Sequence, residues 1–299
     1  MPANGGAGHP LRSRVVTANG LRFATLEAGD GPLALCLHGF PDSAHTWQHL
    51  LPELAAAGFH GVAPFMRGYA PTAVPADGCY RMSALVADAV ALHEALGGDG
   101  QAVLIGHDWG AEAAYGAAAR APGRWRRVVT LAVPPLSLDE RIFADYEQLK
   151  RFFYFFLLQS PLAEDIVAAR DMEFLDRLWA DWSPGYEPGE ALARAKQSLR
   201  AAENLRAAIG YYRDYPVPAS YRGGPAPAAE PAGPAAAGPQ PTLYLHGDAD
   251  GCIALDLVRD AGQHLPPGSR MTVIEGAGHF LHLEKPAEVT EHILAWVTG

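Results

Sequence analysis

Residues 106–110 read Gly-His-Asp-Trp-Gly and follow the apolar run Ala-Val-Leu-Ile at 102–105. A stretch rich in small residues, 111–120, comes directly after them. An apolar run, a Gly-x-nucleophile-x-Gly turn and a helix-like stretch together describe a nucleophile elbow, in which a strained strand-to-helix turn lifts one side chain above a parallel sheet. The sequence therefore predicts a strand, a sharp turn and a helix, with Asp108 raised at the turn.

The central residue of such a turn is usually Ser, and Asp108 changes the chemistry that the turn supports. A carboxylate needs no base to activate it. It attacks carbon by displacement and leaves an ester of the enzyme, which water must then hydrolyse. The residue therefore argues against a serine lipase or esterase, and it favours the opening of an epoxide or the displacement of a halide.

Apolar runs alternate with helical patterns through the first 135 residues. The expected strands are 21–26, 33–37, 61–64, 102–105 and 128–132. Between them lie helical stretches such as 82–96, where apolar residues recur at helical spacing. This alternation predicts a mostly parallel sheet that is covered by helices on both faces.

The pattern changes after Pro135. Only helices rich in aromatic residues are expected from 138 to about 215, and a Pro/Ala/Gly-rich stretch, 216–241, follows. Strand patterns resume at 242–246 and 271–274, before a last helix at 286–297.

The simplest organisation is one α/β core with an inserted helical cap. We expect residues 1–135 and 239–299 to form the core, and residues 136–238 to form the cap together with its Pro/Ala-rich return segment. The cap should then lie over the carboxyl edge of the sheet.

Composition limits the possible partners and location. The chain has 299 residues, 49% of them hydrophobic, and a net charge of −10, which gives no reason to expect a nucleic acid. It has neither an apolar signal region at its start nor an apolar run long enough for a membrane span. Cys36, Cys79 and Cys252 form no metal pattern, and their odd number suits a reducing cytoplasm, so we predict a cytoplasmic protein.

The partners of Asp108 should lie on other loops at the same edge of the sheet, in the chain order nucleophile, acid, His. His279 follows the strand expected at 271–274, and we expect it to activate the hydrolytic water. Asp250 follows the strand before that and should orient the His279 ring and stabilise its cation. Asp248 is the competing acid.

A fourth element is the turn that follows the strand at 33–37. Backbone N–H groups of Phe40 and Trp109 are expected to form an oxyanion hole for the intermediate of ester hydrolysis. We expect His38, Pro41 and the Trp109 side chain to border the substrate, with His38 acting mainly as a structural hydrogen bonder beneath the loop.

The chain resembles an α/β-hydrolase of the epoxide hydrolase and haloalkane dehalogenase branch. The matching pieces are residues 38–41 (His-Gly-Phe-Pro), 67–69 (Arg-Gly-Tyr), 106–110, 247–250 (Gly-Asp-Ala-Asp) and 278–286 (Gly-His-Phe-Leu-His-Leu-Glu-Lys-Pro). Together they span nearly the whole chain. One departure is Met66, where relatives often carry Asp before Arg-Gly.

The resemblance helps to separate the two activities. Haloalkane dehalogenases often carry Asn where this chain has Phe40, whereas epoxide hydrolases have two cap tyrosines that donate to the epoxide oxygen. Tyr212, in an aromatic-Tyr-Arg motif, is the firmer candidate, with Tyr211 as the alternative. Tyr154, five residues before Gln159, is the other candidate, although a neighbouring aromatic residue could serve instead.

The sequence thus predicts an epoxide hydrolase that forms an alkyl ester on Asp108 and releases a vicinal diol with the help of His279. The substrate is expected to be a small apolar epoxide. No metal or organic cofactor is expected, because carboxylate, phenols and imidazole supply every role. The alternatives are a haloalkane dehalogenase and a non-catalytic ligand-binding relative. The oligomeric state stays open, with a homodimer as one option.

Overall fold

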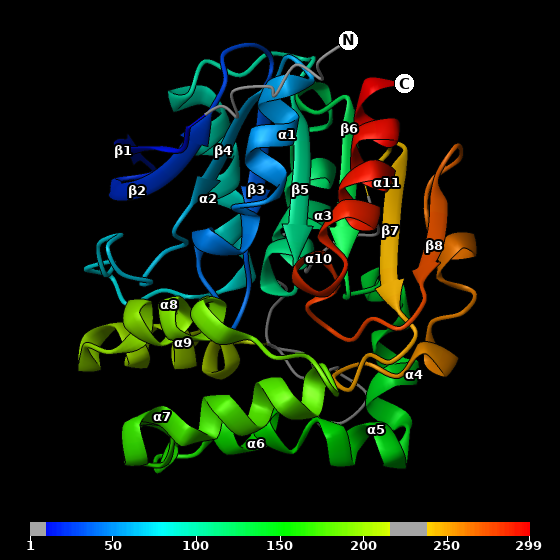
Figure 1. The fold of residues 1–299 in the computed structure, drawn as a ribbon. Coiled ribbons are helices and arrows are strands. Elements are labelled where there is room, and N and C mark those ends of the chain that lie inside the picture. Colours follow the sequence, from blue (N-terminus) through cyan, green and yellow to red (C-terminus); the bar gives the residue numbers. More distant parts are fainter. Residues whose placement is uncertain (1–9, 216–237) are drawn as a thin grey trace, which may run out of the picture.

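An eight-stranded, mostly parallel sheet forms the centre of the molecule (Figure 1). The computed structural model describes residues 10–215 and 238–299. The strand order is β1-β2-β4-β3-β5-β6-β7-β8, and only the β1–β2 and β2–β4 pairs are antiparallel. The strands are β1 (Arg12–Ala18), β2 (Leu21–Ala28), β3 (Leu33–Leu37), β4 (His60–Pro64), β5 (Val103–His107), β6 (Arg127–Leu131), β7 (Thr242–Gly247) and β8 (Arg270–Ile274).

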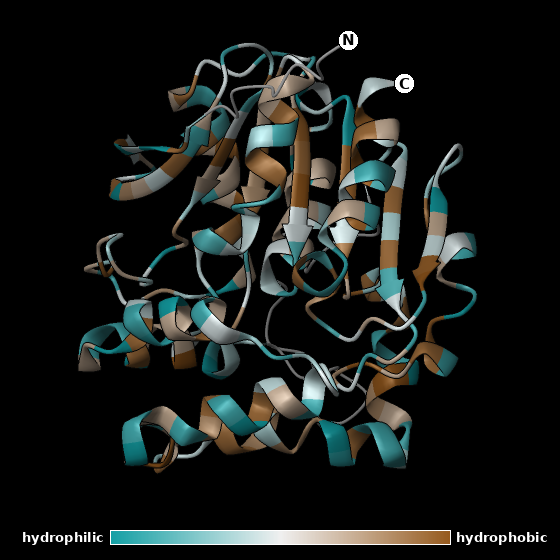
Figure 2. Ribbon diagram, in the orientation of Figure 1, coloured by the Kyte–Doolittle hydropathy of each residue, from teal (hydrophilic) through white to brown (hydrophobic). Residues whose placement is uncertain are grey.

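The central strands are buried on both faces. Every residue of β3, β5 and β7 is buried, and the hydropathy colouring shows the middle of the sheet as largely apolar (Figure 2). Helices on the two faces exclude water from these strands, which explains why they appear as continuous apolar runs in the sequence. The predicted parallel sheet with flanking helices is confirmed.

The sequence analysis missed β1. Four of its first five residues, including Val15, are exposed, and the strand pairs with β2 at the edge of the sheet. An edge strand of this kind carries a weak apolar pattern, because only one face is covered. Its formation depends on pairing with β2.

The helices of the core include one that packs very closely against the sheet. They are α1 (Leu50–Ala56), α2 (Met82–Ala95), α3 (Trp109–Arg120), α10 (Leu281–Glu284) and α11 (Pro286–Thr298). A Cβ atom on Gly110 would lie 2.2 Å from the carbonyl oxygen of Leu37, and one on Gly106 would lie 2.2 Å from that of Gly110. Both glycines of the elbow are therefore needed so that α3 can approach β3 and β5.

The described part of the predicted cap contains six α-helices, which lie below the tips of the parallel strands (Figure 1). They are α4 (Asp139–Ala144), α5 (Tyr146–Arg151), α6 (Phe153–Gln159), α7 (Ala163–Trp182), α8 (Gly189–Leu199) and α9 (Ala202–Asp214). Helix α7 is interrupted at Ala169–Met172, where Arg170, Asp171 and Met172 have positive φ. The Pro/Ala-rich return segment of the predicted cap lies largely at 216–237, outside the described residues.

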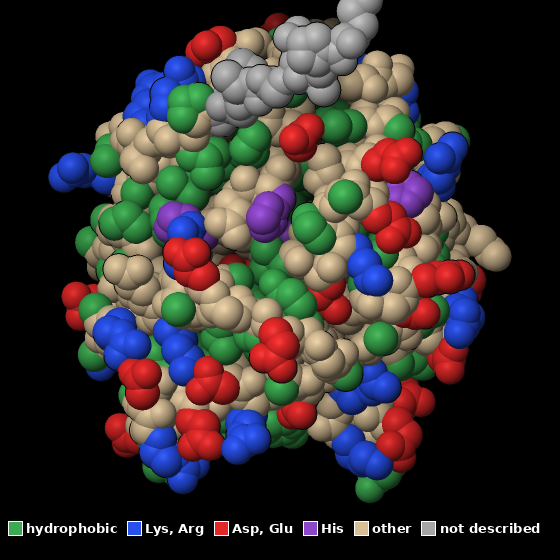
Figure 3. Space-filling view, in the orientation of Figure 1, with side chains coloured by type: hydrophobic (Ala, Val, Ile, Leu, Met, Phe, Trp, Pro, Cys, Tyr) green, Lys and Arg blue, Asp and Glu red, His purple; other side chains and the backbone are tan. Residues whose placement is uncertain are grey.

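The surface carries charges of both signs. On the face shown in Figure 3, basic and acidic side chains are interspersed over the core and the cap. Each helix within 10–215 and 238–299 is too short or too polar to cross a lipid bilayer.

Candidate active site

Asp108 occupies the sharp turn between β5 and α3. Its backbone has φ 52° and ψ −123°, a conformation that is rare for a residue with a side chain. The turn is fixed because the backbone N–H of Asp108 donates to Leu131 on β6, and its carbonyl accepts from Ala111 and Glu112 on α3. The elbow thus raises the carboxylate at the carboxyl edge of the sheet, as the sequence predicts.

The loop after β3 holds one oxygen of this carboxylate. The backbone N–H of Phe40 donates to Asp108 Oδ1 over 2.7 Å. A Cβ atom on Gly39 would lie 2.1 Å from the same oxygen, so only glycine permits this approach. Trp109 is the first residue of α3, a position at which a backbone N–H has no partner within the helix. Oδ1 therefore accepts from the loop after β3, and Oδ2 is the oxygen that lies near His279.

His279 lies between two carboxylates. Its Nδ1–H donates to Asp250 Oδ2 over 3.1 Å, and its Nε2 lies 3.6 Å from Asp108 Oδ2. The ring is fully buried, and Nε2 has no hydrogen-bond partner among the described residues. Because Nδ1 is bound to Asp250, the imidazole presents Nε2 to the nucleophile.

The structure brings Asp250 to His279 and leaves Asp248 away from it. Asp250 is buried, and its Oδ1 accepts from the backbone N–H groups of Cys252 (2.7 Å) and Ile253 (2.9 Å). Asp248 is exposed and accepts from the backbone N–H of Gly276. The geometry thus favours Asp250 as the orienting acid.

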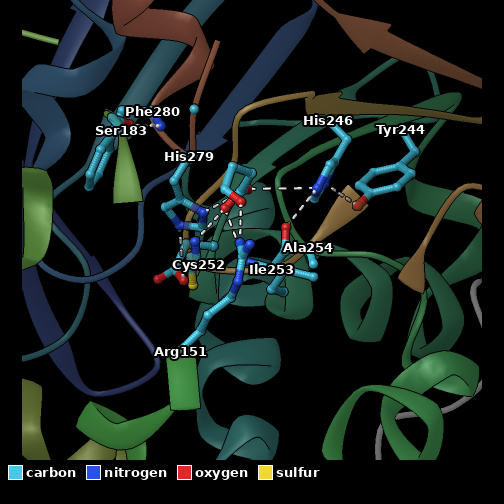
Figure 4. A network of polar contacts seen from close by, with 12 residues as sticks. Arg151, Ser183, Tyr244, His246, Cys252, Ile253, Ala254, His279 and Phe280 are labelled. Carbon is cyan, nitrogen blue, oxygen red and sulfur yellow. Dashed lines mark hydrogen bonds and ion pairs between the residues drawn. The ribbon is translucent and has the colours of Figure 1, made fainter. Parts of the chain in front are cut away.

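A second histidine, His246, holds the loop that carries Asp250. His246 Nε2–H donates to the carbonyl of Ile253, so its Nδ1 accepts from the Tyr244 hydroxyl over 2.6 Å (Figure 4). From the cap, Arg151 donates to the backbone carbonyl of Asp250 over 2.7 Å. The loop that carries the acid is therefore fixed from both the core and the cap.

Neighbouring charges shift pKa values within the triad of Asp108, Asp250 and His279. Burial alone would lower the pKa of His279, but the carboxylates of Asp250 and Asp108 raise it to about 10. Burial alone would raise the pKa of Asp250, yet the imidazolium of His279 lowers it. The two neighbouring carboxylates therefore favour the protonated form of His279.

A small cavity lies beside Asp108, with a volume of about 50 Å³. Its lining is largely aromatic and comes from both the core and the cap. Besides Asp108, the lining residues include Trp109, Phe143, Phe152, Tyr154, Phe155, Tyr212 and Tyr215. A substrate of ordinary size can enter only if side chains around the cavity move.

Both predicted tyrosines line this cavity. The Tyr154 hydroxyl lies 3.3 Å from Cys252 Sγ, and burial raises the pKa of Tyr154 and Tyr212 well above the ordinary value. Both phenols therefore keep their protons and can donate. The competing Tyr211 donates instead to the carbonyl of Arg67 over 2.9 Å, outside the cavity lining. The geometry thus favours Tyr212 over Tyr211.

Two predicted substrate contacts lie elsewhere. His38 Nδ1–H donates to Gly39, and its Nε2 accepts from the backbone N–H of Met66, so both ring nitrogens are occupied. The carbonyl of Pro41 accepts from the indole of Trp179 on α7. Neither residue is among those that line the cavity beside Asp108. Both residues thus take part in structural hydrogen bonds, and Trp109 is the one predicted substrate-binding residue that lines this cavity.

Comparisons with known proteins agree with this geometry. A model of the alpha/beta hydrolase fold family matches residues 32–286. The chain is 30% identical to an epoxide hydrolase of Caballeronia sordidicola, over 94% of this chain and 92% of that protein. It is 31% identical to epoxide hydrolase 3 of Mus musculus, over 94% and 75%. This chain belongs to the epoxide hydrolase branch of the α/β-hydrolase family.

Solved structures show the same fold for this branch. Epoxide hydrolase A of Mycobacterium thermoresistibile superimposes on the present hydrolase with a TM-score of 0.79. The two sequences are 26% identical, and the match covers 97% of this chain and 99% of the other. The cap is therefore part of the shared architecture.

Two buried groups of side chains have the composition of metal ligands. One is Asp250, Cys252 and His279, of which Asp250 and His279 belong to the triad. The other is Asp42, His107 and His282, beneath the site. In this hydrolase, His107 Nε2–H donates to the backbone carbonyl of His279, which makes it a support for the catalytic ring.

The sequence analysis missed two carboxyls that line the same cavity, Glu112 and Asp139. Glu112 lies one helical turn after Asp108, so helical spacing could have placed it on the same face of α3. Asp139 belongs to the cap, and no local pattern connects it with the nucleophile.

Proposed function

We propose that this protein is an epoxide hydrolase that converts an epoxide to a vicinal diol through an ester of Asp108. The observation that carries the proposal is one cavity that contains a carboxylate nucleophile and the side chains of two protonated phenols, Tyr154 and Tyr212. The relatives named epoxide hydrolases support it. The roles of the individual residues are our proposal from the geometry.

In the first step, Oδ2 of Asp108 attacks a carbon of the epoxide. The bond between this carbon and the ring oxygen breaks, and its electron pair moves to the oxygen. Hydrogen bonds from Tyr154 and Tyr212 strengthen as that charge develops. The product of this step is an ester of Asp108 that carries an alkoxide. Proton transfer to this alkoxide gives the hydroxyalkyl ester.

Alkylation removes the charge of Asp108, one of the two carboxylates that raise the pKa of His279. His279 then holds its proton less strongly. Its imidazolium gives one proton to the alkoxide formed by ring opening, which becomes a hydroxyl. The neutral ring that results is a base. The first step thus prepares His279 for the second.

In the second step, Nε2 of His279 removes a proton from a water molecule, which attacks the carbonyl carbon of the ester. Negative charge develops on Oδ1, the oxygen to which the Phe40 N–H already donates. As this intermediate collapses, the departing alkoxide takes the proton of the new carboxyl group, which releases the diol and restores the Asp108 carboxylate. Asp250 stabilises the imidazolium during this step.

Halide displacement is the second candidate, because the same nucleophile and base would serve it. It is supported by the indole Nε1 of Trp109, which is buried and has no partner among the described residues. Parallel assays on epoxides such as styrene oxide and on haloalkanes separate the two. We expect diol release; halide release without diol formation would instead establish the dehalogenase.

The proposal also covers location and assembly. We propose a cytoplasmic enzyme, supported by the free thiols of Cys36, Cys79 and Cys252. Light scattering on the purified protein tests the oligomeric state, for which a homodimer is one option.

A further inference from the structure

The cavity beside Asp108 has a polar wall that the hydrolysis of an apolar epoxide does not use. Glu112 on α3 and Asp139, the first residue of α4, line the cavity together with the nucleophile. One comes from the core and the other from the cap. Tyr215 lines the same region and donates its hydroxyl to Asp139 Oδ2 over 2.9 Å.

Glu112 is only 9% exposed, and its Oε2 has no hydrogen-bond partner among the described residues. A carboxyl oxygen buried in this way is costly, and structural networks normally satisfy such atoms. The unpartnered oxygen belongs to a side chain that lines the substrate cavity. It is therefore placed to accept from a ligand.

The surroundings of Glu112 and Asp139 also favour a ligand that donates a hydrogen bond. Burial raises the pKa of Glu112 well above its ordinary range, and the neighbouring Asp139 raises it further. Burial raises the pKa of Asp139 to about 6. None of the described residues that line the cavity is Lys or Arg.

We propose that Glu112 and Asp139 form a subsite for a hydrogen-bond donor, a hydroxyl or a protonated amine, that the substrate carries a few atoms from its epoxide. The short separation follows from the chain, because Glu112 lies in the first turn of α3 and its backbone N–H donates to the carbonyl of Asp108. The substrate is then amphipathic, with an aromatic-lined region at its epoxide and a polar end at this pair. This inference rests on the proposed epoxide hydrolase activity.

The test compares short-chain terminal epoxides that differ only at the far end, which is methyl, hydroxymethyl or ammoniomethyl. For the unchanged enzyme, we expect kcat/KM to be about 2- to 10-fold higher for a polar end than for methyl, the range for one hydrogen bond. Glu112→Gln should bring this ratio close to one. Glu140→Gln changes an exposed acid next to Asp139 and serves as the matched control.

Calorimetry with the corresponding diols gives a second readout that does not depend on turnover. Tighter binding of the hydroxyl- or amine-ended diol, lost in Glu112→Gln and kept in Glu140→Gln, supports the subsite even if no epoxide in the series is hydrolysed. In that event, only the proposed function fails. Equal binding and equal kcat/KM across the series, unchanged by Glu112→Gln, would show that the pair merely links the cap to the core. The hydrolase activity would then stand without the subsite.

Discussion

Nε2 of His279 lies 3.6 Å from Oδ2 of Asp108, and no described residue forms a hydrogen bond with this nitrogen. The base therefore faces the oxygen that becomes esterified, and water must enter between them after alkylation. The separation leaves His279 Nε2 free to take a proton from that water. The predictions below follow from this arrangement.

Replacing the orienting acid should affect turnover far more than replacing its neighbour in the sequence. Asp250→Asn removes the charge that stabilises the His279 imidazolium, so we expect kcat to fall by roughly 10³- to 10⁴-fold. Asp248→Asn should change kcat little, because Asp248 is exposed and bonds only to the loop at Gly276. Steady-state kinetics on both folded variants test this. Equal losses would remove Asp250 from its proposed role.

The two cap phenols should act on ring opening. Tyr154→Phe and Tyr212→Phe each remove one donor that strengthens in the transition state, so each should slow alkylation by roughly 10- to 1000-fold. The double variant should be nearly inactive. Rapid mixing with single-turnover detection of the ester isolates this step.

Tyr211→Phe is the matched control for these phenols, because the Tyr211 hydroxyl donates to the carbonyl of Arg67. It should reduce stability modestly and leave alkylation unchanged. If the double variant of Tyr154 and Tyr212 opened epoxides at the parental rate, the two tyrosines would be packing residues.

A buried histidine should make the protein lose stability in acid. Burial lowers the pKa of His38 to about 4, so the folded state keeps the ring neutral while the unfolded chain binds a proton below about pH 6.5. The stability contributed by His38 is therefore present above pH 6.5 and is lost as the pH falls toward 4. The loss is on the order of 3 kcal/mol, since each pKa unit corresponds to about 1.4 kcal/mol.

Urea unfolding between pH 7 and 4 measures this loss. Burial raises the pKa of Asp42 to about 7, which has the opposite effect on stability, so the pH dependence is compared between variants. His38→Asn should be less stable at pH 7 and should lose less on acidification, whereas His49→Asn, at an exposed position, should follow the parent. Identical pH dependence in His38→Asn and the parent would contradict the account.

The parts of the fold that the sequence predicts are those with a local cause. Gly106 and Gly110 permit the close approach of α3, and the apolar run before them is buried on both faces, so β5, the elbow and α3 could be recognised from one stretch. Strand β1 could not, because its residues are mostly exposed and it forms by pairing with β2.

The candidate site also has residues that the sequence predicts and residues that it does not. Asp108 and His279 follow strands of a parallel sheet, whose carboxyl ends meet at one edge, so chain order alone brings them together. Asp139 and Glu112 line one cavity only because the cap folds over the core, which no spacing in the sequence indicates. His38 was expected to act mainly as a structural hydrogen bonder, and its ring nitrogens do bind backbone groups, one of them on Met66 beyond β4.

The central claim is the covalent ester on Asp108, and intact-protein mass spectrometry of the His279→Gln variant tests it most directly. This variant keeps the nucleophile but lacks the base, so ester formation should outpace hydrolysis after mixing with an epoxide. We predict a mass increase equal to one substrate molecule, which peptide mapping places on Asp108. Diol formation by the unchanged enzyme with no adduct in the variant under single-turnover conditions, or an adduct on another residue, would contradict the account.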